Sequence, residues 1–290
     1  MTEIKQEVRQ FYDQVGWKQV SQDVYQNAHY EDLRPVSREY IHRCHMRVKQ
    51  HLEPTGRFLL DAGSGPIQYP EYLTYSDGYQ YRVCADISIT ALREARQRIA
   101  EHGLYVVADI ANLPFKDDAF DGIVTLHTIH HLPEKEHMQA YIGLYRVLKP
   151  RKTAIVVNGW ASPPLMKMAD PFIRTSNRIR GLVRRILRKP KPTSIVDQKK
   201  TVQSKKEKSN NAKGTFTNKH DVDWVKQKVG SQMPLEILVW RSVSVRFLRS
   251  LIHPMTGGRW WLRLLYWLEE CFPHYFGEKG QYPLIVIRKD

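Results

Sequence analysis

The segment from residue 57 to residue 160 alternates short apolar runs with helical patterns, and few folds accommodate this alternation. The helical patterns cover 90–103, which we expect Gly103 to close, and 134–150, which we expect Pro150 to stop. The apolar runs have the length of buried strands and lie at 57–66, 79–88, 104–110, 120–128 and 153–160. Strands that alternate with helices pair in parallel and are covered by helices on both faces. The sequence therefore predicts an α/β protein with a doubly wound, mostly parallel sheet.

The flanking segments extend this core on both sides. Helical patterns at 3–12 and 36–52 precede it, and strand patterns at 235–247 and 282–290 follow it. The segment 260–272 is a very apolar helix, for which we favour a place in the hydrophobic core. We therefore divide the chain into an N-terminal helical cap, the core, a basic and partly mobile insertion, and a C-terminal part that completes the sheet and covers the site; these are residues 1–54, 55–160, 161–213 and 214–290.

The insertion holds most of the positive charge. The chain has a formal net charge of +15, and residues 174–208 carry thirteen basic side chains against two acidic ones, a net +11. We expect the prolines of 161–172 to break regular structure, 174–190 to form a basic helix and 193–213 to be mobile. The basic helix has one apolar stripe, made of Ile179, Leu182, Val183, Ile186 and Leu187.

Three interpretations of the 174–190 helix stay open. It can lie on an anionic membrane surface, with its arginines on phosphates and its stripe in the interface. It can pack the stripe on the protein as a lid, or bind RNA through its charge. RNA is the least favoured, because residues 174–213 contain no aromatic side chain on which a base could stack.

Polar residues follow three of the predicted strands, where an open parallel sheet binds its ligands. Asp61-Ala-Gly-Ser-Gly65 ends the first strand, and its glycines allow a ligand to approach the backbone closely. Asp86 lies 21 residues after Gly65, where a carboxylate can accept hydrogen bonds from both hydroxyls of a ribose. Asp109 follows the third strand and can accept from an adenine amino group. The pattern predicts a nucleoside site.

A nicotinamide- or flavin-dependent oxidoreductase is the main rival for such a site. These enzymes use three glycines to hold a pyrophosphate, and Gln68 stands here at the third position. A glutamine impedes the close packing that this position needs, so the loop suits a ligand without phosphates. An NAD-dependent oxidoreductase is therefore disfavoured.

The segments LLDAGSGP, CADIS, VVADIANLPFKDDAFDGIVTLHTIHHLP and LYRVLKPRKTAIVV resemble, in this order and spacing, the class I S-adenosylmethionine-dependent methyltransferases of the small-molecule type, methyltransferase type 11. The resemblance covers roughly residues 55 to 158. It implies a Rossmann-like sheet of seven strands whose final strand is antiparallel, and S-adenosyl-L-methionine as the cofactor. The residues that it implies for cofactor binding are Tyr12, Asp61, Gly63, Ser64, Gly65, Asp86, Ile87, Asp109, Ile110 and His127.

Histidines after the fourth strand are the candidate catalytic bases. A neutral imidazole can take a proton from a hydroxyl, a phenol or an acidic carbon, and we single out His127 and His130 for this role. For His131 we favour a structural role in the turn. No metal is expected, because methyl transfer from a sulfonium needs none and no His/Cys cluster has metal-ligand spacing; Cys44, Cys84 and Cys271 are far apart.

The predicted function is methyl transfer to a small-molecule or lipid-linked acceptor, with oxygen or carbon favoured over nitrogen. The segment Leu126–Ile129 lacks the Asn/Asp-Pro-Pro-aromatic motif of many nitrogen methyltransferases. An RNA methyltransferase and a non-catalytic, methyltransferase-like partner protein are the alternatives. The sequence shows neither a long apolar run nor a signal-peptide pattern, so we expect a cytoplasmic protein with peripheral membrane contact through 174–190 if the membrane interpretation holds.

Overall fold

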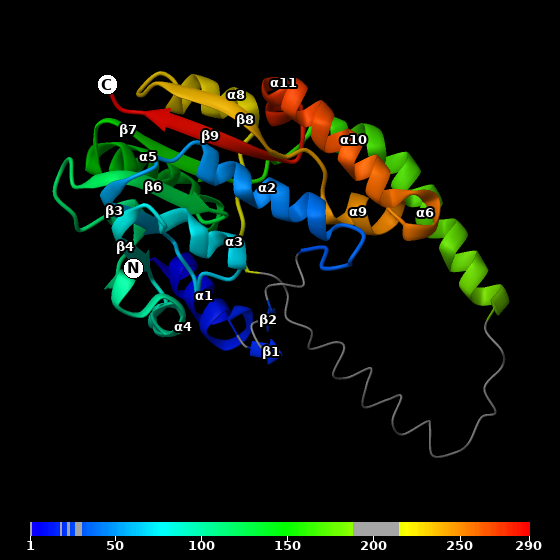
Figure 1. The fold of residues 1–290 in the computed structure, drawn as a ribbon, viewed down its shortest axis with the longest axis horizontal. Coiled ribbons are helices and arrows are strands. Elements are labelled where there is room, and N and C mark those ends of the chain that lie inside the picture. Colours follow the sequence, from blue (N-terminus) through cyan, green and yellow to red (C-terminus); the bar gives the residue numbers. More distant parts are fainter. Residues whose placement is uncertain (1, 18, 22–23, 27–30, 188–214) are drawn as a thin grey trace, which may run out of the picture.

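The computed structural model describes the chain except for residues 1, 18, 22–23, 27–30 and 188–214. Its centre is a seven-stranded sheet in the order β5-β4-β3-β6-β7-β9-β8 (Figure 1). The strands are β3 (Gly56–Ala62), β4 (Tyr79–Asp86), β5 (Gly103–Val107), β6 (Phe120–Leu126), β7 (Leu148–Val157), β8 (Leu235–Arg241) and β9 (Tyr282–Arg288). All neighbours pair in parallel except β9, which is antiparallel to both β7 and β8. The predicted fold class, including the antiparallel strand, is confirmed.

Helices cover both faces of the sheet because successive strand residues point to opposite sides. Leu60 belongs to a core shared with α5 (Glu134–Val147) and with the turns at Val222–Trp224 (α8) and Val225–Val229. Leu59 belongs to a second core, which includes side chains of α2 (Arg38–Gln50), α3 (Pro70–Leu73) and α4 (Ile89–Ile99). The sheet is thus buried between two helical layers.

A third cluster joins the helices beyond the end of β8. It contains Tyr40 and Cys44 of α2, Leu248 of α9 (Val245–Leu251) and Leu262 of α10 (Gly258–Cys271). Met166 of α6 (Pro164–Leu187) packs against the same cluster, and α6 then extends past the rest of the molecule in Figure 1. A short helix α11 (Pro273–Lys279) leads back to β9.

The N-terminal residues lie near the carboxyl ends of the strands. Helix α1 (Glu3–Phe11) continues into a π-helical turn at Tyr12–Gly16. Two short strands that the sequence did not predict, β1 (Gln19–Ser21) and β2 (Val24–Tyr25), form an antiparallel pair beside it. Figure 1 places α1 below α3 and away from α9 and α10.

The predicted ends of two core helices were wrong. Helix α4 stops at Ile99, and the next residue, Ala100, adopts a positive φ of 40°. Gly103 does not cap the helix but begins β5 and pairs with Arg82. Helix α5 stops at Val147, since β7 begins at the next residue and Pro150 lies within that strand. Helix α4 therefore ends at the unusual backbone of Ala100, before the glycine, and α5 ends where strand β7 begins, before the proline.

The predicted break at 161–172 was also wrong, because α6 begins at Pro164 and runs through this segment. A proline at the first position of a helix loses no hydrogen bond, so Pro164 starts the helix instead of interrupting it. Helix α6 tolerates Pro171 in its interior, where Thr175 donates its hydroxyl to the Pro171 carbonyl at 2.9 Å. The expected mobile segment 193–213 lies outside the described residues.

The predicted strand 235–247 is shorter than expected. Strand β8 ends at Arg241, and α9 begins at Val245. The side chain of Ser244 accepts a hydrogen bond from the Phe247 amide, which is the usual contact of a helix N-cap. The alternation of apolar and polar residues suggested a strand up to residue 247, but Ser244 caps a helix that begins at Val245.

Candidate active site at the carboxyl ends of the strands

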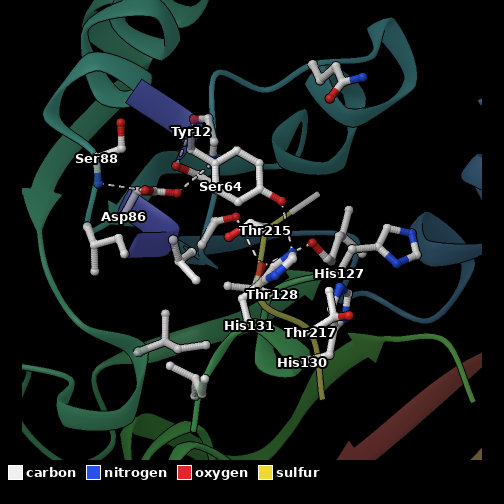
Figure 2. A pocket seen from close by; sticks show the side chains of 18 of the residues that line it. Tyr12, Ser64, Asp86, Ser88, His127, Thr128, His130, His131, Thr215 and Thr217 are labelled. Atoms are coloured by element: carbon white, nitrogen blue, oxygen red, sulfur yellow. Dashed lines mark hydrogen bonds between the residues drawn. The ribbon is translucent and has the colours of Figure 1, made fainter. Parts of the chain in front are cut away.

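A cavity of about 480 Å³ opens at the carboxyl ends of β3, β4 and β6. The structure brings every sequence-predicted site residue to its wall, although they come from five separate segments. Figure 2 shows Asp86 and Ser88 toward one end of the cavity, His127 and His130 toward the other, and Tyr12 between them. These residues are Tyr12, Asp61, Gly63, Ser64, Gly65, Asp86, Ile87, Asp109, Ile110, His127 and His130.

The loop after β3 requires glycine at two positions. Gly63 and Gly65 have positive φ angles of 76° and 53°. A Cβ on Gly63 would lie 2.2 Å from Cγ2 of Thr128, and one on Gly65 would lie 2.9 Å from Cζ2 of Trp17. No side chain fits these spaces, so the glycines are needed for the packing of the loop as well as for ligand approach.

Asp86 is the one predicted acid of the site that no cation neutralises in the described part of the chain. Its Oδ2 accepts from the Gly65 amide at 2.9 Å, and its Oδ1 accepts from the Ser88 amide at 2.8 Å. Burial raises the pKa of Asp86 to about 6, although both amides favour the charged form. Each carboxylate oxygen keeps a lone pair for a ligand, so two neighbouring hydroxyls are a suitable partner.

The two other predicted acids are occupied by cations. Asp61 accepts from Arg82 Nη2 at 2.5 Å and from its Nε at 3.1 Å, and both side chains are buried. Asp109 contacts Lys5, which also contacts Glu136, and accepts from the Ala111 amide at 3.0 Å. Asp61 and Asp109 therefore hold the site together, and any contact with a ligand uses their remaining lone pairs.

The N-terminal segment covers the cavity through contacts that the sequence indicated only in part. The Tyr12 hydroxyl lies 2.9 Å from His131 Nε2, and the Tyr12 ring stacks on Trp17 with 4.8 Å between centroids. The hydroxyl of Ser88 donates to Asp13. Sequence analysis missed Lys5, on α1, and Trp17, directly after the π-helical turn, because isolated side chains in such a segment carry no recognisable signal.

The three histidines after β6 are neutral at pH 7. Burial lowers the pKa of His127 to about 3 and that of His131 to about 4, and it places the pKa of His130 well below the usual range. His131 Nδ1 donates to the Phe216 carbonyl at 2.7 Å, so its Nε2 accepts from Tyr12. This pair of bonds gives His131 the structural role that the sequence suggested.

His127 and His130 differ in their partners. His130 Nδ1 lies 3.0 Å from Oδ1 of Asn158, which fixes its ring. His127 has a positive φ of 57° and packs edge-on against Trp240 and Tyr282, at 5.1 and 5.5 Å between centroids. Within the described residues no hydrogen bond occupies the His127 ring, so it is available to a ligand.

The far wall of the cavity comes from segments after residue 160, from the N-terminal cap and from the residues at the start of α3, where no sequence motif pointed to a site. Arg241 pairs with Glu31 at 2.5 Å, and both are buried. The remaining members are Tyr69, Tyr72, Thr215, Thr217, Lys219, Trp240 and Tyr282. This wall is aromatic and cationic, whereas the wall around Asp61, Asp86 and Asp109 is acidic.

Residues 60–156 match the family model of the methyltransferase domain. These residues form a methyltransferase domain of the class I, Rossmann-like type. The match covers the glycine loop, Asp86, Asp109 and the histidines, and it confirms the choice of a methyltransferase over an oxidoreductase.

Two curated relatives show how far the similarity extends. The ubiquinone/menaquinone biosynthesis C-methyltransferase UbiE of Vibrio parahaemolyticus is 30% identical over 156 residues, which are 50% of this chain and 59% of the relative. The probable tRNA methyltransferase 9B of Homo sapiens is 30% identical over 124 residues, which are 42% of this chain and 26% of the relative. The chain therefore spans less than two thirds of the length of either relative.

A solved structure has the same fold. Geranyl diphosphate C-methyltransferase of Streptomyces coelicolor aligns with a TM-score of 0.54 and 16% identity, covering 100% of this chain and 99% of that one. Among the residues described, no group of histidine, cysteine and acidic side chains is arranged to hold a metal ion. None of the helices described is both long and apolar enough to cross a bilayer.

Proposed function

We propose that the protein transfers a methyl group from S-adenosyl-L-methionine to an acceptor bound in the same cavity. The supporting observation is that one cavity joins an acidic wall, with the glycine loop and the unneutralised Asp86, to an aromatic and cationic wall with His127 at the border. The first wall suits the donor and the second the acceptor. A displacement reaction needs both reactants in line within a few ångströms, and a shared cavity provides that alignment.

The donor residues have distinct tasks in this proposal. Asp86 accepts from the two ribose hydroxyls, while Gly63, Ser64 and Gly65 lie against the methionine part. Ile87 and Ile110 enclose the adenine, and Asp109 accepts from its amino group with a lone pair that Lys5 leaves open. Tyr12 covers the cofactor and limits access of water. The donor supplies a sulfonium whose methyl group is already activated for displacement.

His127 is the proposed general base, with His130 as its positioning neighbour. His127 faces the cavity with an unoccupied ring, and its ring centroid lies 6.3 Å from that of His130. A base with a pKa near 3 is in its neutral form at pH 7 but has little driving force for proton transfer. It suits an acceptor whose own proton is acidic, such as a phenol or an activated carbon.

We favour oxygen or carbon of a small-molecule or lipid-linked acceptor. The curated relatives include a ubiquinone/menaquinone C-methyltransferase, which supports a carbon acceptor. They also include a probable tRNA methyltransferase, so methylation of RNA is the second candidate. Tyr12 and Trp17 cover the cavity beside the donor wall, which favours a small acceptor over a folded nucleic acid.

The exposed side chains of helices α6 and α10 support peripheral contact with an anionic membrane. In α6, the side chains of Ile179, Leu182 and Val183 are 55%, 57% and 46% exposed, so this part of the stripe does not pack on the protein as a lid. In α10, the side chains of Trp260 and Trp261 are 60% and 53% exposed. The prediction that the helix 260–272 lies in the hydrophobic core was therefore wrong for these two residues. Tryptophans and arginines on one helical unit are typical of membrane-interface binding.

Isothermal titration with S-adenosylmethionine, and separately with NAD, tests the donor assignment. We expect binding of the first alone. Turnover is then measured as methyl transfer to phenolic and quinol acceptors and to total RNA. Transfer to RNA that disappears at high salt would replace the small-molecule acceptor by RNA, and donor binding with no transfer to any acceptor would favour a non-catalytic partner protein.

A further inference from the structure

Lys219 is a cation of the cavity wall that has no acidic partner within the described part of the chain. Lys5 contacts Asp109, and Arg241 pairs with Glu31. Lys219 is half-buried, and burial alone lowers its pKa, with no carboxylate close enough to raise it again. Burying an ammonium without a counter-ion is unfavourable, so an anion that enters the cavity would stabilise the charged form of Lys219.

Backbone hydrogen bonds fix the segment that carries Lys219. The Phe216 carbonyl accepts from His131 Nδ1 at 2.7 Å, and the Asn218 amide donates to the His130 carbonyl at 2.7 Å. The His220 carbonyl accepts from the Ala161 amide at 3.0 Å. The residues between these anchors, Thr215, Thr217 and Lys219, all line the cavity. The alternation places two hydroxyls and one ammonium along the same wall.

The position of Lys219 separates it from the donor wall. A Cβ on Gly159 would lie 3.2 Å from Lys219 Nζ, so the ammonium rests beside the backbone that follows β7. In the sheet order, β6 lies between β7 and β3, the strand that precedes the glycine loop. His127, which follows β6, therefore lies between Lys219 and the acidic wall that we assign to the donor. In the proposed reaction the methyl group crosses the cavity beside His127.

We propose that Lys219 binds an oxyanion of the methyl acceptor, either a carboxylate or a phosphate. The hydroxyl of Thr217 adds a donor, as does that of Thr215, which is buried and lacks a partner in the described structure. This inference rests on the proposed function and names the class of acceptor. An ion pair with hydrogen bonds compensates the burial of both charges and orients the acceptor toward His127.

The test uses the full chain saturated with S-adenosylhomocysteine and three probes of similar size: phenyl phosphate, benzoate and the uncharged phenol. We expect the wild type to bind at least one anion at least tenfold more tightly than phenol. Lys219→Met should lower that preference at least tenfold, whereas Lys219→Arg should retain most of it. Lys226→Met is the matched control, because Lys226 is an exposed lysine that pairs with Glu278 outside the cavity.

The affinity for S-adenosylmethionine shows whether a negative result refutes the role of Lys219 or the proposed function itself. S-adenosylmethionine should bind the wild type and Lys219→Met equally well. An equal anion preference in both proteins would overturn the inference, and so would a large loss of donor affinity in Lys219→Met, which would assign the lysine to the donor's carboxylate. A wild type that binds no S-adenosylmethionine would instead refute the proposed function, and the anion preference of the unloaded protein would still be readable.

Discussion

Replacing Asp86 with asparagine tests the proposed donor site. The loss of the carboxylate should change both the affinity for S-adenosylmethionine and the pH dependence of stability. Asparagine keeps the shape of the side chain but loses the negative charge and one of the two acceptor oxygens. Hydrogen bonds to a charged group contribute about 1–3 kcal/mol, so affinity for S-adenosylmethionine at pH 7.5 should fall about 5- to 150-fold in Asp86→Asn. Isothermal titration measures this directly.

The pH dependence of stability gives an independent magnitude. The pKa of Asp86 is about 6 in the folded protein, against about 3.9 in an unfolded chain. The folded protein therefore keeps a proton between these pH values that unfolding releases, and stability falls as the pH rises through this window. The difference corresponds to about 3 kcal/mol in total, which is lost progressively as the pH rises from about 4 through the folded-state pKa and is almost completely lost by about pH 7.

Urea unfolding at pH 4 and pH 7 compares the wild type with Asp86→Asn. Between pH 4 and pH 7 Asp86 should lower the stability of the wild type by about 2 kcal/mol of that total, because pH 4 already lies near the pKa of the unfolded chain. The variant should lack this fall, so its stability relative to the wild type should improve between pH 4 and pH 7. Asp117→Asn is the control, since the Asp117 side chain is 70% exposed. If donor affinity and the pH difference are both unchanged in Asp86→Asn, the ribose assignment and the electrostatic account of this carboxylate are wrong together.

Three further variants probe other parts of the molecule. Gly63→Ala should lower the unfolding free energy by about 1–3 kcal/mol because of its positive φ and the contact with Thr128, whereas Gly181→Ala, with nothing within 4 Å, should leave it equal or raise it by up to about 1 kcal/mol in urea unfolding. His127→Gln should lower turnover at least about 100-fold in a methyl-transfer assay, a larger loss than any change in donor affinity that titration shows; full turnover would exclude it as the base. The double variant Trp260→Ser, Trp261→Ser should sediment less with anionic liposomes than the wild type, and equal sedimentation with neutral and anionic liposomes would remove the membrane proposal.

The sequence predicted which residues form the acidic wall of the cavity because their positions are fixed by local geometry. A strand that ends in Asp61 and glycines can bind a ligand only at its carboxyl end, and Asp86 and Asp109 follow neighbouring strands for the same reason. Each of these residues reaches the cavity through the strand that precedes it. Such positions need no knowledge of distant contacts.

The aromatic and cationic wall escaped prediction because it depends on contacts between distant segments. Arg241 meets Glu31 across 210 residues of sequence, and Lys219 reaches the cavity only because the histidine loop binds its backbone. The alternation of Thr215, Thr217 and Lys219 was visible in the sequence, but it adjoins a segment that we expected to be mobile. Without the histidine contacts nothing marked these residues as part of a wall.

The place of β9 in the sheet has a consequence for how the chain is made. Strand β9 follows β8 in the sequence but lies between β7 and β8 in space. Val157 ends β7 and Tyr282 begins β9, so the ribosome adds more than 120 residues before the edge of β7 finds its neighbour. During that interval a nascent chain exposes an unpaired, strongly apolar strand edge, which favours association with other chains. From this strand order we expect synthesis to depend on chaperones, and we expect chains truncated before Tyr282 to aggregate.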